Sequence, residues 1–98
     1  MTQRFGPSKG TKTNVTGTGA SITLVAANPN RKGLTIFNDS GVTANIDLSG
    51  GTASATSCSL DMASQDFYEL PVMANQEVYK GAITGLWASG DIRITEFE

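Results

Sequence analysis

From residue 20 onward, apolar and polar residues alternate over short stretches that are separated by turn-forming residues. Residues 44–48 give the clearest example, because every second residue is apolar, which predicts a strand with one buried face. Residues 91–97 repeat the pattern, with Ile92 and Ile94 predicted to point inward. A period of two residues is typical of β-strands, and no long window shows the helical period.

Turn residues such as Asn-Pro, Asn-Asp and Gly-Gly divide this region into roughly seven to nine short strands, at the spacing typical of two-sheet β-folds. The predicted strands cover residues 22–25, 34–37, 44–48, 56–62, 67–70, 78–87 and 91–97. We therefore predict an all-β domain over residues 20–98, an antiparallel β-sandwich of jelly-roll or immunoglobulin-like type. The order of the strands does not follow from the pattern.

Residues 1–19 lack the alternation and are rich in Gly, Ser, Thr and Lys. Charge also distinguishes the two ends of the chain: residues 1–32 contain five basic residues and no acidic one, whereas residues 33–98 contain two basic and nine acidic residues. This pattern predicts a flexible basic N-terminal arm over residues 1–19.

A basic arm can bind nucleic acid, bind an acidic protein surface or remain a solvated tail. The widely spaced charges and the acidic remainder of the chain disfavour nucleic acid. We prefer an arm that contacts a neighbouring subunit, and the solvated tail stays open as an alternative. The candidate contact residues are Arg4, Phe5, Lys9 and Lys12.

Missing residue types exclude several kinds of chemistry. The chain has no histidine, which excludes Ser-His-Asp and Cys-His catalysis and histidine zinc sites. Its single cysteine, Cys58, cannot form an internal disulfide, and we predict a buried, inert thiol on the apolar face of its strand. The acidic residues are scattered without calcium-loop spacing, so no metal, cofactor or enzymatic activity is predicted. No apolar stretch has the length of a membrane span, and no membrane partner is predicted.

Some side chains have both a structural and a binding interpretation. Arg31 precedes a predicted central strand, and we expect its stem to pack over the sandwich while its guanidinium binds nearby carbonyls. Aromatic residues are expected mainly in the core, and an exposed sugar-binding platform stays open as an alternative. The aromatic residues in question are Phe37, Phe67, Tyr68, Tyr79 and Trp87.

Several stretches resemble small virion structural proteins of tailed bacteriophages, of the capsid decoration or cement type. The longest is an Asn-Pro-Asn-Arg turn followed by a Leu-x-Ile-x-Asn strand, and the likeness covers roughly residues 20–97. The chain has Ala63-Ser64-Gln65-Asp66 where relatives often have a Gly-rich turn. The stretches that carry the resemblance are residues 26–40, 50–54, 68–71, 79–90 and 95–97.

This resemblance implies a non-enzymatic phage protein that is made in the host cytoplasm and located on the exterior of the capsid. Its implied partner is the major capsid protein, and it is implied to form a homo-oligomer, often a trimer. No cofactor and no nucleic acid are implied. A tail, baseplate or head–tail joining component is the first alternative, and a carbohydrate-binding β-module is the second.

Overall fold

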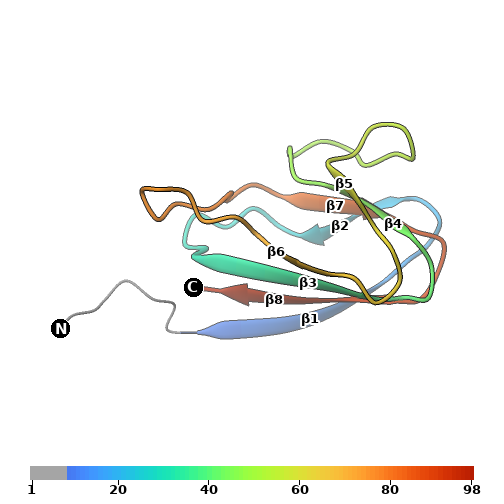
Figure 1. The fold of residues 1–98 in the computed structure, drawn as a ribbon, viewed down its shortest axis with the longest axis horizontal. Coiled ribbons are helices and arrows are strands. Elements are labelled where there is room, and N and C mark those ends of the chain that lie inside the picture. Colours follow the sequence, from blue (N-terminus) through green and yellow to red (C-terminus); the bar gives the residue numbers. More distant parts are fainter. Residues whose placement is uncertain (1–8) are drawn as a thin grey trace.

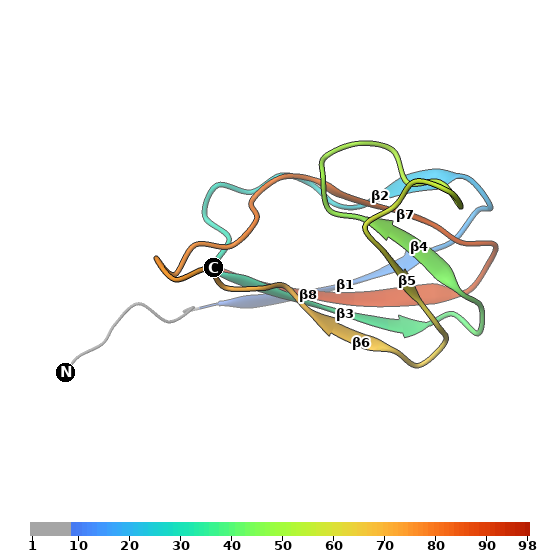
Figure 2. The ribbon, with the colours of Figure 1, turned by 45° about the horizontal axis from the view of Figure 1, so that its top comes forward.

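The computed structural model describes residues 9–98, which form two four-stranded antiparallel β-sheets packed as two layers (Figures 1 and 2). This confirms the predicted all-β, two-sheet fold. Within residues 9–98 there is no helix, and so none that is long and apolar enough to cross a membrane. The strands are β1 (Gly10–Thr16), β2 (Ser21–Val25), β3 (Gly33–Asp39), β4 (Ala44–Asp47), β5 (Leu60–Met62), β6 (Phe67–Glu69), β7 (Ile83–Leu86) and β8 (Asp91–Phe97).

The strands pair in a nested order. One sheet, here called sheet A, has the order β1-β8-β3-β6, and the other, sheet B, has the order β2-β7-β4-β5. Thus β4 pairs with β5, β3 with β6, β2 with β7 and β1 with β8. The described chain is arranged as one long antiparallel hairpin rolled into two layers, so that β1 and β8 lie side by side in sheet A (Figure 1).

The core lies between the sheets and is built from the inward residues of each alternating strand. In β8, Ile92 and Ile94 are buried while Arg93 is exposed, as the alternation predicts. Each buried aliphatic side chain of this size stabilises the fold by about 1.5–3 kcal/mol. The core residues are Leu24, Leu34, Ile36, Ala44, Ile46, Met62, Leu70, Val78, Ile83, Trp87, Ile92 and Ile94.

Residues 10–16 differ from the sequence-based prediction, which placed them in a flexible arm. They form β1, which pairs with β8 from Gly10–Phe97 to Thr16–Asp91. Six of the seven residues of β1 are exposed and Val15 is half-buried, so backbone pairing rather than side-chain burial attaches the strand. The predicted boundary between residues 19 and 20 therefore falls inside the sandwich.

The predicted strand over residues 56–62 is also shorter than expected. Only Leu60–Met62 pair with β4, and Met62 is the buried residue of this strand. Residues 48–57 instead form a long connection that lies on the outer side of sheet B (Figure 1). The alternation of Thr56, Cys58 and Leu60 therefore does not reflect a buried face.

Candidate interaction surface

The two sheets differ in what covers their outer faces. On sheet B, the connection 48–57 crosses the strands and is attached to them by hydrogen bonds. The Thr84 hydroxyl donates to the Gly51 carbonyl at 2.8 Å, and the Ala53 amide donates to the Ser21 hydroxyl at 3.1 Å. Ala53, which is part of this connection, is itself buried. The chain thus shields the outer face of sheet B with its own residues.

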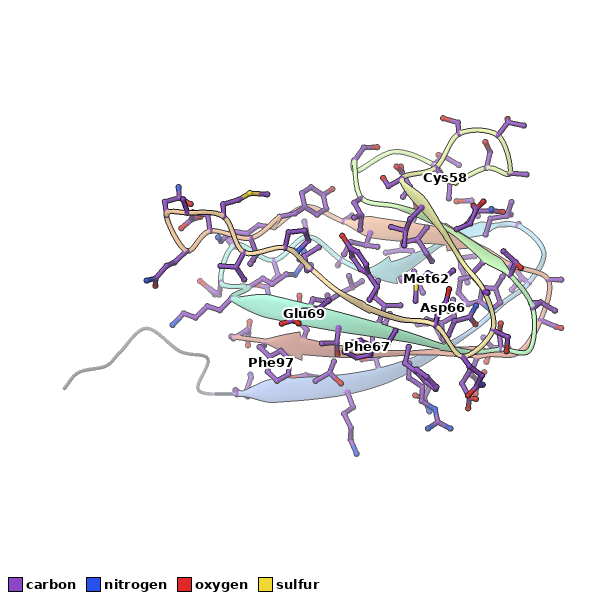
Figure 3. All side chains as sticks on the ribbon, viewed as in Figure 1. Cys58, Met62, Asp66, Phe67, Glu69 and Phe97 are labelled. Atoms are coloured by element: carbon purple, nitrogen blue, oxygen red, sulfur yellow. The ribbon has the colours of Figure 1, made fainter. Side chains whose placement is uncertain are left out.

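The outer face of sheet A, in contrast, presents aromatic side chains to solvent. Phe37 of β3 lies opposite Phe67 of β6 on one side and Arg93 of β8 on the other. Phe67 is 63% exposed, and Phe37 is half-buried. Figure 3 shows Phe67 and Phe97 on sheet A, across the molecule from Cys58 on the sheet B side. Phe67 is the largest of the apolar side chains that are exposed among residues 9–98.

Phe97, near the end of β8, is flanked by glycines on both neighbouring strands. Its cross-strand partners are Gly10 of β1 and Gly33 of β3. A Cβ atom at Gly10 would lie 3.1 Å from the Phe97 ring, and one at Gly33 would lie 3.6 Å from it. The two glycines leave room for the ring to lie against the sheet, which keeps this end of the outer face flat.

Charged side chains occupy the end of this face that is nearer the β3–β4 turn. Arg93 pairs with Asp39 at 2.8 Å, and the Gln65 amide donates to the same carboxylate. Thr16 donates its hydroxyl to Asp91 at 2.7 Å. The Arg93 side chain is 60% exposed, so its ion pair contributes little stability, at most about 1 kcal/mol.

The structure places two of the four predicted contact residues. Lys9 precedes β1 and pairs with Glu98 at 3.1 Å. Lys12 is exposed on β1 and borders a shallow hollow together with Asn14 and Arg93. Arg4 and Phe5 lie outside the described residues. The two lysines therefore belong to a paired strand and its border, not to a flexible arm.

The carboxylate of Glu98 is held in its charged form. The Asn28 side-chain amide donates to it at 2.9 Å, and Lys9 supplies a hydrogen bond and a positive charge. These contacts, with the Asn28 hydrogen bond as the largest cause, lower the pKa of Glu98 below its ordinary value. The result is a link between the end of β8 and the turn that precedes β3.

Sequence reasoning missed two exposed apolar residues that follow β6. Val72 is 56% exposed and Met73 is 58% exposed. They precede a tight turn in which the Gln76 amide donates to the Met73 carbonyl. The signal in the sequence is the pair of large apolar residues directly after Pro71, where a polar turn is the norm.

Arg31 confirms its predicted structural role. Its side chain is completely buried, and its guanidinium donates to the carbonyls of Tyr79, Gly81 and Ala26 at 2.8–2.9 Å. Its Nε also donates to Glu96 at 2.7 Å. Burial of the charge is tolerated because four donated hydrogen bonds and one carboxylate satisfy it. Arg31 is thus unavailable to a ligand.

Two aromatic residues of the possible sugar platform are also structural. Trp87 is 2% exposed, and its indole Nε1 donates to the Gly90 carbonyl at 2.8 Å. Tyr79 is half-buried, and its hydroxyl donates to the Ala82 carbonyl. Trp87 therefore has no face open for stacking on a sugar, and Phe67 is the most exposed of the aromatic residues in question.

Cys58 differs from its predicted environment. It is half-buried in the connection before β5, and its thiol donates to Asp61 at 3.3 Å. The hydrogen bond to Asp61 is the largest of the causes that raise the pKa of this thiol, which disfavours the thiolate. Among residues 9–98, no group of three or more acidic or thiol side chains is arranged to hold a metal ion.

Comparisons of the chain with protein-family models, with curated proteins and with solved structures found no match.

Proposed function

We propose that this protein is a structural component of a tailed-bacteriophage particle that decorates the exterior of the capsid and binds the major capsid protein. The observation that carries the proposal is the difference between the two outer faces. Residues 48–57 cover sheet B, whereas sheet A leaves Phe67 63% exposed beside Phe37. A flat, partly aromatic face suits docking onto another protein surface.

The strand order supports a finer description of the fold. Eight strands in two sheets, with nested pairs from β4–β5 outward to β1–β8, match the pattern of a jelly roll, and we assign the fold to that type. Jelly rolls are frequent among viral capsid proteins, as they are among lectins. One fold serves many functions, so the jelly-roll assignment agrees with the proposed function but is not sufficient evidence for it.

The basic residues near the N-terminus supply a second set of contacts. Lys9 and Lys12 lie at one end of sheet A, and Arg4 and Phe5 precede them in the sequence. We propose that these residues bind an acidic part of the major capsid protein next to the face that docks. Many copies on one particle would make individually weak contacts sufficient for stable attachment.

The role proposed is non-enzymatic. Two groups that could carry chemistry are engaged in structure: Arg31 donates to carbonyls, and the Cys58 thiol donates to Asp61. A tail, baseplate or head–tail joining role uses the same kind of surface and differs in copy number. A capsid decoration protein is present in a simple ratio to the major capsid protein, whereas a joining component is present in a few copies.

Quantitative mass spectrometry of purified phage particles tests the proposal. We expect a copy number equal to that of the major capsid protein or a simple fraction of it. A few copies per particle would move the assignment to the tail or the head–tail junction. Absence from the particle would overturn the virion assignment and favour a carbohydrate-binding module, which a glycan array then tests.

A reattachment assay tests the docking face itself. Purified protein is added to particles that lack it, and bound protein is measured after sedimentation. We expect Phe67→Ser to weaken attachment about tenfold or more, as loss of an aromatic contact at an interface commonly does. The matched control is Thr56→Ala, on the exposed connection over sheet B. Equal attachment of both variants would contradict docking through sheet A.

A further inference from the structure

The four edge strands of the sandwich differ in how well they are protected against pairing with another strand. Strand β2 has a register shift between Thr23 and Val25, and β5 and β6 have three residues each. Irregular and short edges of this kind prevent unwanted strand addition. Strand β1 has seven residues and a continuous register with β8, and so it is the most regular of the four edges.

The backbone pattern shows which groups of β1 point to the open edge. Lys9 and Glu98 exchange both of their amide–carbonyl hydrogen bonds, at 3.2 and 2.9 Å, and the Gly17 amide donates to the Gly90 carbonyl. Antiparallel pairs alternate between bonded and non-bonded positions. Odd-numbered residues therefore bond to β8, and the amides and carbonyls of Gly10, Lys12, Asn14 and Thr16 point away from it.

The charges along this edge would attract those of the same edge in a second, antiparallel copy. Lys12 lies towards one end of β1, and Asp91 lies beside Thr16 at the other. Neither takes part in an ion pair among residues 9–98. If two β1 strands run antiparallel, the basic end of each meets the acidic end of the other, whereas a parallel arrangement would place the two lysines side by side.

We propose that β1 pairs with β1 of a second copy of this chain, antiparallel about a two-fold axis at Asn14. This joins two copies of sheet A into one continuous sheet. This register pairs Lys12 with Thr16 of the second copy and Asn14 with Asn14 of the second copy. The backbone allows it, because the amides and carbonyls of these residues all point to the open edge. Such an isologous contact closes on itself as a dimer.

Charge selects this register over its neighbour. With the axis at Asn14, Lys12 lies opposite Thr16 of the second copy, and that Thr16 lies opposite its own Asp91. The Cα atoms of Lys12 and this Asp91 are therefore two strand spacings, about 10 Å, apart. The long lysine side chain spans that distance over the small Thr16. With the axis at Thr13, the two lysines become diagonal neighbours instead, which is less favourable. The pairing does not depend on the proposed function.

Sedimentation equilibrium of the full chain over a range of concentrations tests the pairing. We expect a monomer–dimer equilibrium that Asn14→Pro weakens about 100-fold, because proline removes an amide at the axis and blocks strand addition. That amide makes no hydrogen bond to β8, so the variant keeps its fold, which circular dichroism checks. The matched control, Asn14→Ala, retains the amide and should still dimerise. A wild-type chain that stays monomeric, or that forms a trimer, would overturn the proposal.

Two further variants keep the proposal falsifiable even if Asn14→Pro unfolds. Lys12→Glu and Asp91→Lys should each weaken the dimer about tenfold, and the double variant should restore it. In a Cys58→Ser background, Asn14→Cys should form an intermolecular disulfide on oxidation, because two-fold related residues at this position lie within disulfide distance. Failure of the charge swap to restore the dimer, or crosslinking through Thr13→Cys instead, would contradict this register.

Discussion

A single buried arginine connects three separate parts of the chain. Arg31 binds carbonyls at residues 26, 79 and 81 and the carboxylate of Glu96 on β8. The carbonyls belong to connections rather than to sheet ladders and are partly buried, so Arg31 supplies a donor that strand pairing does not. Arg31 thus replaces the backbone pairing that the irregular end of the sandwich lacks.

Substitution of Arg31 should be among the more damaging changes in the chain. We expect Arg31→Met to lower the free energy of unfolding by about 3–5 kcal/mol, because it leaves Glu96 and the carbonyls without their partner. Arg93→Met, which breaks the exposed pair with Asp39, should cost less than about 1 kcal/mol. Urea unfolding measures both, and equal effects would contradict the structural role of Arg31.

The contacts of Glu98 predict how stability depends on pH. Its folded-state pKa lies below the unfolded value, so its contribution is present above the unfolded pKa and is lost as the pH falls through the folded pKa. We expect Asn28→Ala to raise the pKa of Glu98 towards the ordinary value, and Lys9→Met to do so as well. A titration of the Glu98 carboxyl carbon by NMR measures this. An unchanged pKa in Asn28→Ala would show that the hydrogen bond is not the main cause.

At the scale of the element, the alternation identified the strands with a buried face and missed β1, which has none. Strands β3, β4 and β8 alternate because their inward residues fill the core, and they lie where the pattern predicts. Strand β1 shows no alternation because nearly all of it is exposed and backbone bonds attach it. The exposed aromatic pair could not be located from the pattern for a related reason, since the register places Phe67 of β6 opposite Phe37 of β3, on strands that are distant in sequence.

Strand β1 also predicts how truncation affects the fold. Removal of residues 1–19 deletes the whole of β1 and exposes the edge of β8, and we expect a large loss in melting temperature. Removal of residues 1–8 leaves the β1–β8 pairing intact and should cost much less. Thermal unfolding followed by circular dichroism compares the two. Similar melting temperatures would mean that β1 contributes little to stability.

At the scale of the whole molecule, the nested pairing orders the strand contacts by their separation along the chain. The β4–β5 pair joins residues 16 positions apart at Asn45 and Asp61, whereas the β1–β8 pair joins residues 75 apart at Thr16 and Asp91. Closing a longer loop has a larger entropic cost. The inner pairs are therefore expected to form before β1 and β8 come together.

Folding kinetics test this order. We expect Ile46→Val, in the core of β4, mainly to slow folding, because β4 belongs to the earliest pair. Val15→Ala, on β1, should mainly accelerate unfolding, because its contacts form last. Stopped-flow folding in urea separates the two rates. A slower folding rate for Val15→Ala with an unchanged unfolding rate would reverse the proposed order.

The connection over sheet B has a practical consequence. Its tip, residues 55–57, is exposed and lies on the side of the molecule opposite to sheet A. If sheet A faces the particle, this tip faces the surrounding medium in every copy. A foreign peptide spliced between Ala55 and Thr56 would then be displayed as a dense, outward-facing array, on a loop whose exposed tip is the kind of site that accepts insertions.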